Sequence, residues 1–267
     1  MSAAGAFGNR LEGLVARLGR WLIDVLDELG RFSILVADTF RVLLRRGFSV
    51  RETVRQFQSI TVRSSTIVLI TALFTGMVLA LQTSVALGRF GAKPYTGSFV
   101  GLAFVLELGP VLTALVVSGR VGAGITAEIG AMTVSEQVDA IRALGADPIQ
   151  KLVVPRMVAA TLGLPMLTML ANLLGILGGL MIATQSGIGA NFYYQSVVNV
   201  VTISDLLSGL VKTFAFGRTL SMVACHQGLS TTGGTVGVGI ATTRAVVISS
   251  IAVLVSDFFL SKLIMLF

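Results

Sequence analysis

Residues 64–88, "SSTIVLITALFTGMVLALQTSVALG", decide the fold class because they contain no charged side chain. A helix needs about 20 apolar residues to cross the hydrocarbon of a bilayer, so this stretch predicts a transmembrane helix. Of the 267 residues in the chain, 54% are hydrophobic and only 12% are charged, whereas soluble domains carry about 25% charged residues. The composition therefore predicts an all-α integral membrane protein.

Further apolar stretches follow the first one along the chain. Residues 94–119 carry only one charge, Glu107, and residues 157–204 carry none, which is too long for a single crossing. The segment "TQSGIGANFYYQS" (184–196), rich in Gly, Asn and Gln, marks the exit of the third span. The five predicted spans are 64–88, 94–119, 157–183, 205–226 and 243–266.

The distribution of Lys and Arg predicts how the spans are oriented, because cytoplasmic loops carry an excess of both. Three basic residues lie near span ends on one side: Arg89, Lys93 and Lys262. The other side carries ten, namely Arg45, Arg46, Arg51, Arg55, Arg63, Arg120, Arg142, Lys151, Arg156 and Arg244. This asymmetry predicts a cytoplasmic N-terminus and a C-terminus on the opposite side. Because the basic residues gather at span ends, we interpret the net charge of +7 as a determinant of membrane topology rather than as a sign of nucleic-acid binding. The N-terminal residues do not have the pattern of a signal peptide.

Residues 1–55 are expected to form a region separate from the spans. Their apolar positions recur with the period of a helix, at Leu11, Leu14, Leu18, Trp21, Val25, Leu29, Phe32 and Val36. Charges appear between them every few residues, which favours an amphipathic helix lying in the cytoplasmic interface over a spanning one. A soluble helical arm that packs on a partner is the alternative. Residues 56–267 form the predicted membrane domain.

The connector between spans two and three is unusually charged and predicts a short cytoplasmic helix. Thr133 and Glu136 have the spacing of a capping box, and Gly145 followed by Pro148 indicates an end, so the helix is predicted at about 134–144. Its apolar face contains Val134, Val138 and Ile141, and its polar face contains Glu136, Asp139 and Arg142. From the residues alone, a connector that covers span ends and a docking element are equally supported.

Four ionisable residues fall inside the predicted spans: Glu107, Lys212, Arg218 and Asp257. A charge at the centre of a bilayer costs at least about 2.5 kcal/mol, so such residues pair or face a cavity. We expect Lys212 to bridge Glu107 and Asp257. Such a network could lock the spans together or contact lipid headgroups, and the sequence leaves both open. Small residues recur every four positions on one helix face, which predicts close packing of another helix there: Ala171, Gly175, Gly179 and Ala183.

Several chemistries find no support in the sequence. The single cysteine, Cys225, excludes an internal disulfide, and the single histidine, His226, stands in no catalytic or metal-binding motif. No phosphate-binding loop occurs, because Lys212-Thr213 lacks the preceding glycine frame. We therefore expect no catalytic residue, metal or cofactor in this chain.

The segment "LELGPVLTALVVSGRVGAGITAEIGAMTVSEQVDAIRALGADPIQKLVVPR" (106–156) closely resembles the MlaE (YrbE-type) permease family, and the resemblance continues through 233–260. It implies a permease domain at 56–267 in the bacterial inner membrane, with an N-terminal interfacial helix and five spans. The implied function is the ABC-driven movement of phospholipids between the inner and outer membranes. Many family members carry a basic residue before the glutamate, where this chain has Leu106.

The same resemblance implies partners and sites. The permease would form a homodimer, with cytoplasmic ABC ATPase subunits that bind ATP and Mg, a periplasmic MCE-domain hexamer and, in many members, a STAS-domain accessory protein. The short cytoplasmic helix would dock into the ATPase through Glu128, Val134, Glu136, Val138, Asp139, Ile141 and Arg142. The lipid cavity would be lined by Met77, Leu81, Gln82 and Val85 of span one. The alternatives are a secondary transporter or channel using Glu107, Lys212 and Asp257 as an ion relay, and a membrane scaffold for peripheral proteins.

Overall fold

The computed structural model describes the backbone of residues 3–266 and the side chains from residue 22 onward, except that of residue 46. Its helices follow one another with short connections. The label α marks an α-helix and η a short π-helical turn, except that η2 is a 3₁₀ turn. The first part of the chain contains α1 (Ala3–Arg46), α2 (Val50–Phe57), η1 (Gln58–Val62), α3 (Arg63–Gly88), η2 (Lys93–Tyr95), α4 (Thr96–Ala103), η3 (Phe104–Leu108), α5 (Gly109–Val117), η4 (Ser118–Gly122) and α6 (Ala123–Val134). The rest contains α7 (Gln137–Ala143), η5 (Ile149–Val153), α8 (Val154–Gln185), α9 (Ala190–Val200), α10 (Ile203–Leu229) and α11 (Gly234–Ile264).

The helices join into long apolar runs that can cross a membrane. Among the described residues, Val50–Gly88, Lys93–Val134, Ile149–Gln185 and Gly234–Ile264 are each long and apolar enough. A fifth span results if α9 and α10, which meet at 74°, count as one bent span. The helical runs extend beyond the predicted spans because charged residues at their ends continue the same helices. The second run, for example, continues past Arg120 to Val134.

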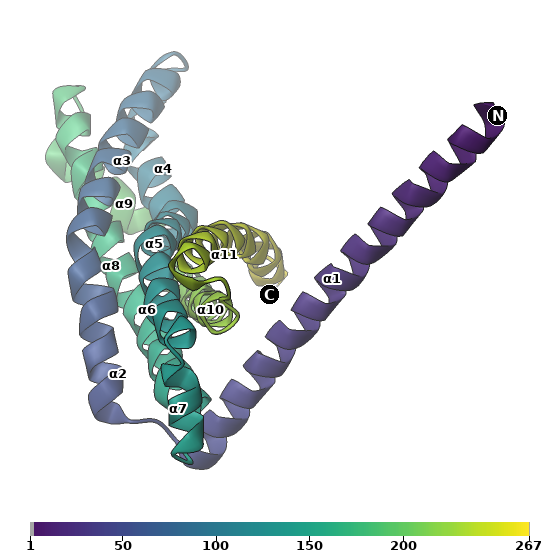
Figure 1. Cartoon of the computed structure of the whole chain (residues 1–267). Helices are drawn as coiled ribbons and strands as arrows, with labels where there is room; N and C mark the ends of the chain where they lie inside the picture. Colours follow the sequence, from purple (N-terminus) through teal and green to yellow (C-terminus); the bar gives the residue numbers. More distant parts are fainter. Residues whose placement is uncertain (1–2, 267) are drawn as a thin grey trace.

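The core of the bundle is built around α8, which packs against both α3 and α10 (Figure 1). The small residues of α8 have their neighbours within the same chain. A side chain at Gly175 would collide with the Phe104 ring, and one at Gly76 of α3 would collide with the Gly175 backbone. The predicted close packing at this stripe is thus a contact of α8 with α3 and η3.

The helix α1 leaves the bundle at an angle (Figure 1). Its C-terminal part packs against the core through Phe32, Leu35, Val36, Phe40 and Leu43. Further toward its N-terminus, Leu22, Ile23, Leu26 and Leu29 are exposed. The predicted positions Leu11, Leu14, Leu18 and Trp21 lie outside the described side chains. A position in the membrane interface therefore stays a prediction for this helix.

The predicted start of the connector helix, at about residue 134 with a capping box, is wrong. No capping box forms between Thr133 and Glu136, because α6 continues to Val134 and the Thr133 hydroxyl donates back to the carbonyl of Ile129 at 2.9 Å. Instead Glu136 precedes α7 with a left-handed backbone, at φ 59°. The predicted end is confirmed. Gly145 has φ 73°, and the N–H groups of Gly145 and Ala146 bond to the carbonyls of Arg142 and Ile141, as in a Schellman motif.

Candidate functional site

Three of the four charges in the predicted spans meet at Lys212 of α10, whose side chain is only 3% exposed. Its Nζ donates to Glu107 Oε1 at 2.7 Å and to Ser261 Oγ at 2.6 Å, and lies 3.3 Å from Asp257 Oδ1. Ser261 in turn donates to Glu107 Oε1 at 3.1 Å. One cation thus holds two carboxylates that come from η3 and α11. We call these four residues the Lys212 cluster.

The backbone around Glu107 explains why a lysine is accommodated there. In a regular helix the carbonyl of Leu106 would accept from the residue four positions on, but that residue is Pro110, which has no N–H. The carbonyl instead accepts from Lys212 Nζ at 3.1 Å. Gly209 lets α10 approach closely, since a side chain there would collide with the carbonyl of Val105. The lysine therefore supplies a donor to a carbonyl to which Pro110 cannot donate.

The fourth intramembrane charge, Arg218, lies apart from the Lys212 cluster. Its side chain is exposed, and its guanidinium lies 5.5 Å from the centroid of the Phe40 ring of α1. Arg218 thus belongs to the contact between α1 and α10. Ser261 is a further member of the cluster that was not predicted, and its only signal in the sequence is its position four residues after Asp257, which puts both on one helix face.

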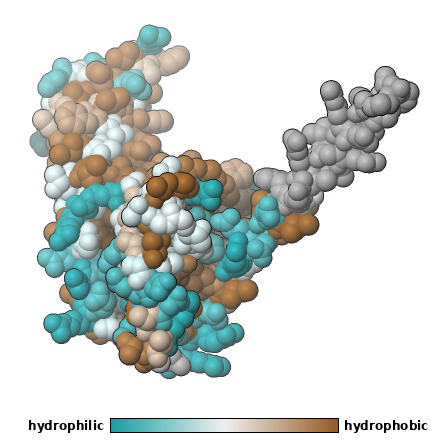
Figure 2. Space-filling view, viewed as in Figure 1, coloured by the Kyte–Doolittle hydropathy of each residue, from teal (hydrophilic) through white to brown (hydrophobic). Residues whose placement is uncertain are grey.

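The residues predicted to bind an ATPase lie on and beside α7. Val138 is buried at 4% exposure, Val134 and Ile141 are half-buried, and Glu136, Asp139 and Arg142 are exposed. Arg142 pairs with Asp139 at 2.9 Å. The apolar residues therefore fix α7 to the bundle while its charges point outward. Figure 2 shows hydrophilic side chains gathered over this end of the bundle.

Glu128 of α6 forms an ion pair with Arg156, a residue whose charge had been interpreted only as an indicator of membrane topology. Its Oε2 lies 2.9 Å from Arg156 Nη2, and the Arg156 side chain is 3% exposed. Arg156 also donates to the carbonyl of Leu152 at 2.7 Å. The pair joins α6 to α8 on both sides of the connector, so it holds the two ends of the α7 segment together.

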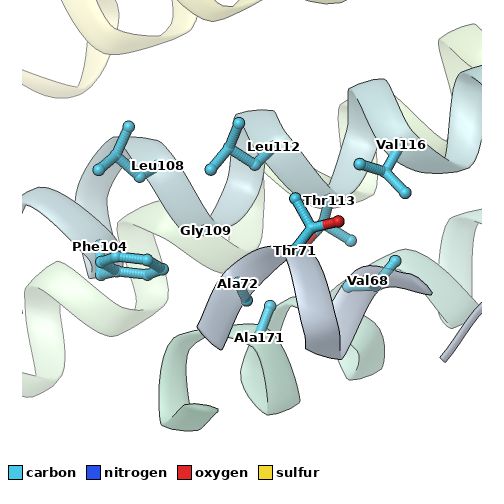
Figure 3. A pocket seen from close by; sticks show the side chains of 10 residues that line it. All are labelled: Val68, Thr71, Ala72, Phe104, Leu108, Gly109, Leu112, Thr113, Val116 and Ala171. Carbon is cyan, nitrogen blue, oxygen red and sulfur yellow. The ribbon is translucent and has the colours of Figure 1, made fainter. Parts of the chain in front are cut away.

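The four residues predicted to line a lipid cavity lie along α3. Leu81, Gln82 and Val85 are exposed, and Met77 is half-buried. The apolar hollow beside α3 (Figure 3), where Val68, Ala72, Phe104 and Ala171 meet, has a volume of about 10 Å³. That space holds about one water molecule. This hollow is therefore too small for an acyl chain.

Comparison with known proteins identifies the family. The family description "Permease MlaE" matches residues 53–263, nearly the whole of the helical bundle. The chain belongs to the MlaE permease family. It is therefore a membrane permease, and relatives in this family are named as permease proteins of ABC transporters.

Relatives of this MlaE-family chain span bacteria and a plant plastid. A probable ABC transporter permease protein of Synechocystis is 42% identical over 86% of this chain and 88% of its own length. The intermembrane phospholipid transport system permease protein MlaE of Haemophilus influenzae is 34% identical over 93% of this chain and 96% of its own. The chloroplastic protein TRIGALACTOSYLDIACYLGLYCEROL 1 of Arabidopsis thaliana is 38% identical over 79% and 61%, respectively.

Proposed function

We propose that this MlaE-family chain moves phospholipids between the inner and outer membranes of a bacterium, as the permease subunit of an ABC transporter in the inner membrane. The observation that carries the proposal is the match to the phospholipid transport permease of Haemophilus influenzae along 93% of the chain. The predicted orientation, with the connector and N-terminus cytoplasmic and the C-terminus periplasmic, belongs to this proposal.

The proposed contact with the ATPase is α7 together with Glu128. The helix is anchored by buried Val138 and exposes Glu136, Asp139 and Arg142 toward the cytoplasm. Short connections on both sides and the Glu128–Arg156 ion pair fix its position. A displacement of α7 by the ATPase would therefore move α6 and α8 as well. The ATPase subunits would bind ATP and Mg, and a STAS-domain protein would bind the ATPase.

The proposed lipid cavity lies between two copies of the chain. The exposed apolar side chains of α3, among them Leu81 and Val85, make an outer face that the described residues of one chain leave uncovered. A second copy facing it would enclose an apolar space suited to acyl chains. An MCE-domain hexamer would receive the lipid on the periplasmic side.

The test is copurification with a P-loop ATPase from cells that express both proteins. Asp139→Ala combined with Glu136→Gly should reduce the copurified ATPase by about 10-fold, because two charged contacts are lost. Glycine is chosen because it adopts the left-handed backbone of Glu136 without strain. Arg89→Ala, at the opposite end of the bundle, is the matched control and should retain the ATPase.

The competing function is a secondary transporter that relays ions through the Lys212 cluster. The feature that favours it is the 43% exposure of the Glu107 side chain. Lipid or ion transport by the purified chain in proteoliposomes without ATPase or ATP would establish this competitor and refute the ABC mechanism.

A further inference from the structure

A polar cleft opens between the first two helical runs, at the end of the bundle that carries α7. One wall is α2 and η1, and the other is η4 and α6. The cleft has two adjoining parts of about 230 and 420 Å³, both lined by Gln56, Ser59, Arg63 and Glu128. Arg120 lines the smaller part and Arg55 the larger one. We call this hollow the arginine cleft.

The arginine cleft carries positive charge that the described part of the chain does not neutralise. Its one carboxylate, Glu128, is already paired with Arg156. Neither Arg63 nor Arg120 lies within ion-pair distance of a described carboxylate. Arg120 is oriented by one hydrogen bond from its Nη1 to Ser64 Oγ, at 2.8 Å, which leaves its other N–H groups available. Guanidinium groups bind phosphate oxygens through paired N–H donors.

An apolar stripe begins where the cleft ends. Arg63 is the first residue of α3, and the exposed residues Ile67, Ile70, Phe74 and Val78 follow it at helical spacing on the same face. Arg63 is the charged end of this stripe, and it directly precedes residue 64, where the first predicted span begins. A molecule bound along this surface would thus meet guanidinium groups at one end and hydrocarbon along the rest. That is the arrangement of a phospholipid, with its phosphate at the interface and its acyl chains in the bilayer.

We propose that the arginine cleft binds the phosphate group of a phospholipid in the cytoplasmic leaflet, while the acyl chains lie along the α3 stripe. Each wall contains a π-helical turn, η1 and η4, a feature common at functional sites. The site would hold a lipid before transport, a role that rests on the proposed function, whereas binding itself can be measured independently of transport.

The experiment titrates the full-length chain in detergent with dioctanoyl phosphatidylglycerol and counts bound lipids by native mass spectrometry. The wild-type chain should bind one lipid tightly. Arg63→Gln combined with Arg120→Gln should weaken that binding by roughly 10-fold or more, because two charge-assisted contacts are lost. Arg63→Gln alone changes an exposed residue that pairs with no described carboxylate, so it should fold normally and weaken the binding by a smaller factor. This single variant guards against misfolding of the double variant.

The control pair Arg51→Gln and Arg244→Gln removes the same charge from exposed positions that do not line the cleft. Equal weakening in the control pair would show general electrostatic attraction and overturn the site. Dioctanoylglycerol has the same tails without the phosphate, and equally tight binding of it would overturn phosphate recognition. Inorganic phosphate that binds the cleft as tightly as the lipid would overturn the assignment to a lipid.

The same variants separate this site from the proposed transport function. Weakened lipid binding with intact ATPase copurification supports the site alone. Unchanged lipid binding in the double variant refutes the site and leaves the ATPase contact at α7 standing.

Discussion

At the scale of single residues, the Lys212 cluster shows how a buried charge is retained in a membrane helix. Lys212 donates to the Leu106 carbonyl, to which Pro110 cannot donate, and it offsets the charges of Glu107 and Asp257. Removing the lysine would leave two carboxylates without their cation. Such breaks are costly because the Asp257 side chain is only 18% exposed and would lose its partner inside the bundle.

Lys212→Met should therefore destabilise the folded chain by about 3 kcal/mol. Neutralising both carboxylates as well, by Glu107→Gln and Asp257→Asn, should restore most of that loss. The measurement is the free energy of unfolding in mixed detergent micelles. Lys262→Met, at an exposed position near the end of α11, is the control, with an expected change of about 0.5 kcal/mol or less. A combined variant no more stable than Lys212→Met would contradict the pairing.

Transport measurements on the same variants address the role of the cluster. If the cluster only locks the helices together, the combined variant should recover transport along with stability. If stability returns and transport stays lost, the ionised groups themselves take part in moving the substrate.

At the scale of elements, close packing of α3 on α8 is set by glycines that face one another. The stripe on α8 was predictable from its four-residue spacing, because that spacing puts small residues on one helix face. A similar stripe occurs on α3, at Ala72, Gly76 and Ala80, but no local pattern shows that the two stripes face each other. Likewise the end of α7 was predictable from Gly145, whereas its start depends on how far α6 continues under the packing of α10. The hydroxyl of Thr133 donates there to the carbonyl of Gly228 at 3.2 Å.

Gly76→Ala should destabilise the chain by about 1–3 kcal/mol, because the added methyl group meets the Gly175 backbone, which cannot move aside without shifting a helix. Gly88→Ala lies on the same helix with open space around it, so it should be neutral or slightly stabilising. Thermal unfolding in detergent compares the two. Equal midpoints for both variants would argue against the backbone contact.

At the scale of the whole molecule, the bundle has two ends that differ in charge and in connections. The segment between α6 and α7 lies at one end, and the turn after α8 lies at the other, because α8 crosses the full bundle between them. The excess of Lys and Arg around the first of these segments predicts that it is cytoplasmic.

Cysteine labelling can test this orientation directly, because the native Cys225 is buried and should not react. Gln185→Cys, at the end of α8, should be modified in intact spheroplasts by a membrane-impermeant maleimide. Ser135→Cys, between α6 and α7, should be modified only after the membrane is broken. The opposite pattern would invert the topology and remove the proposed ATPase contact from the cytoplasm.

The sequence by itself determined the membrane class, the helical spans, the charged connector and the membership of the family. The first three depend on hydropathy, charge counts and local spacing, which are properties of neighbouring residues along the chain, whereas the membership rests on the resemblance of residues 106–156 and 233–260 to the family. Only the tertiary structure decided that Ser261 joins Lys212, that Arg218 stays apart, that Glu128 pairs with Arg156, and that Arg63 and Arg120 face one cleft. Each of these contacts joins residues from separate helices, and no local pattern encodes which helix faces meet when the bundle packs.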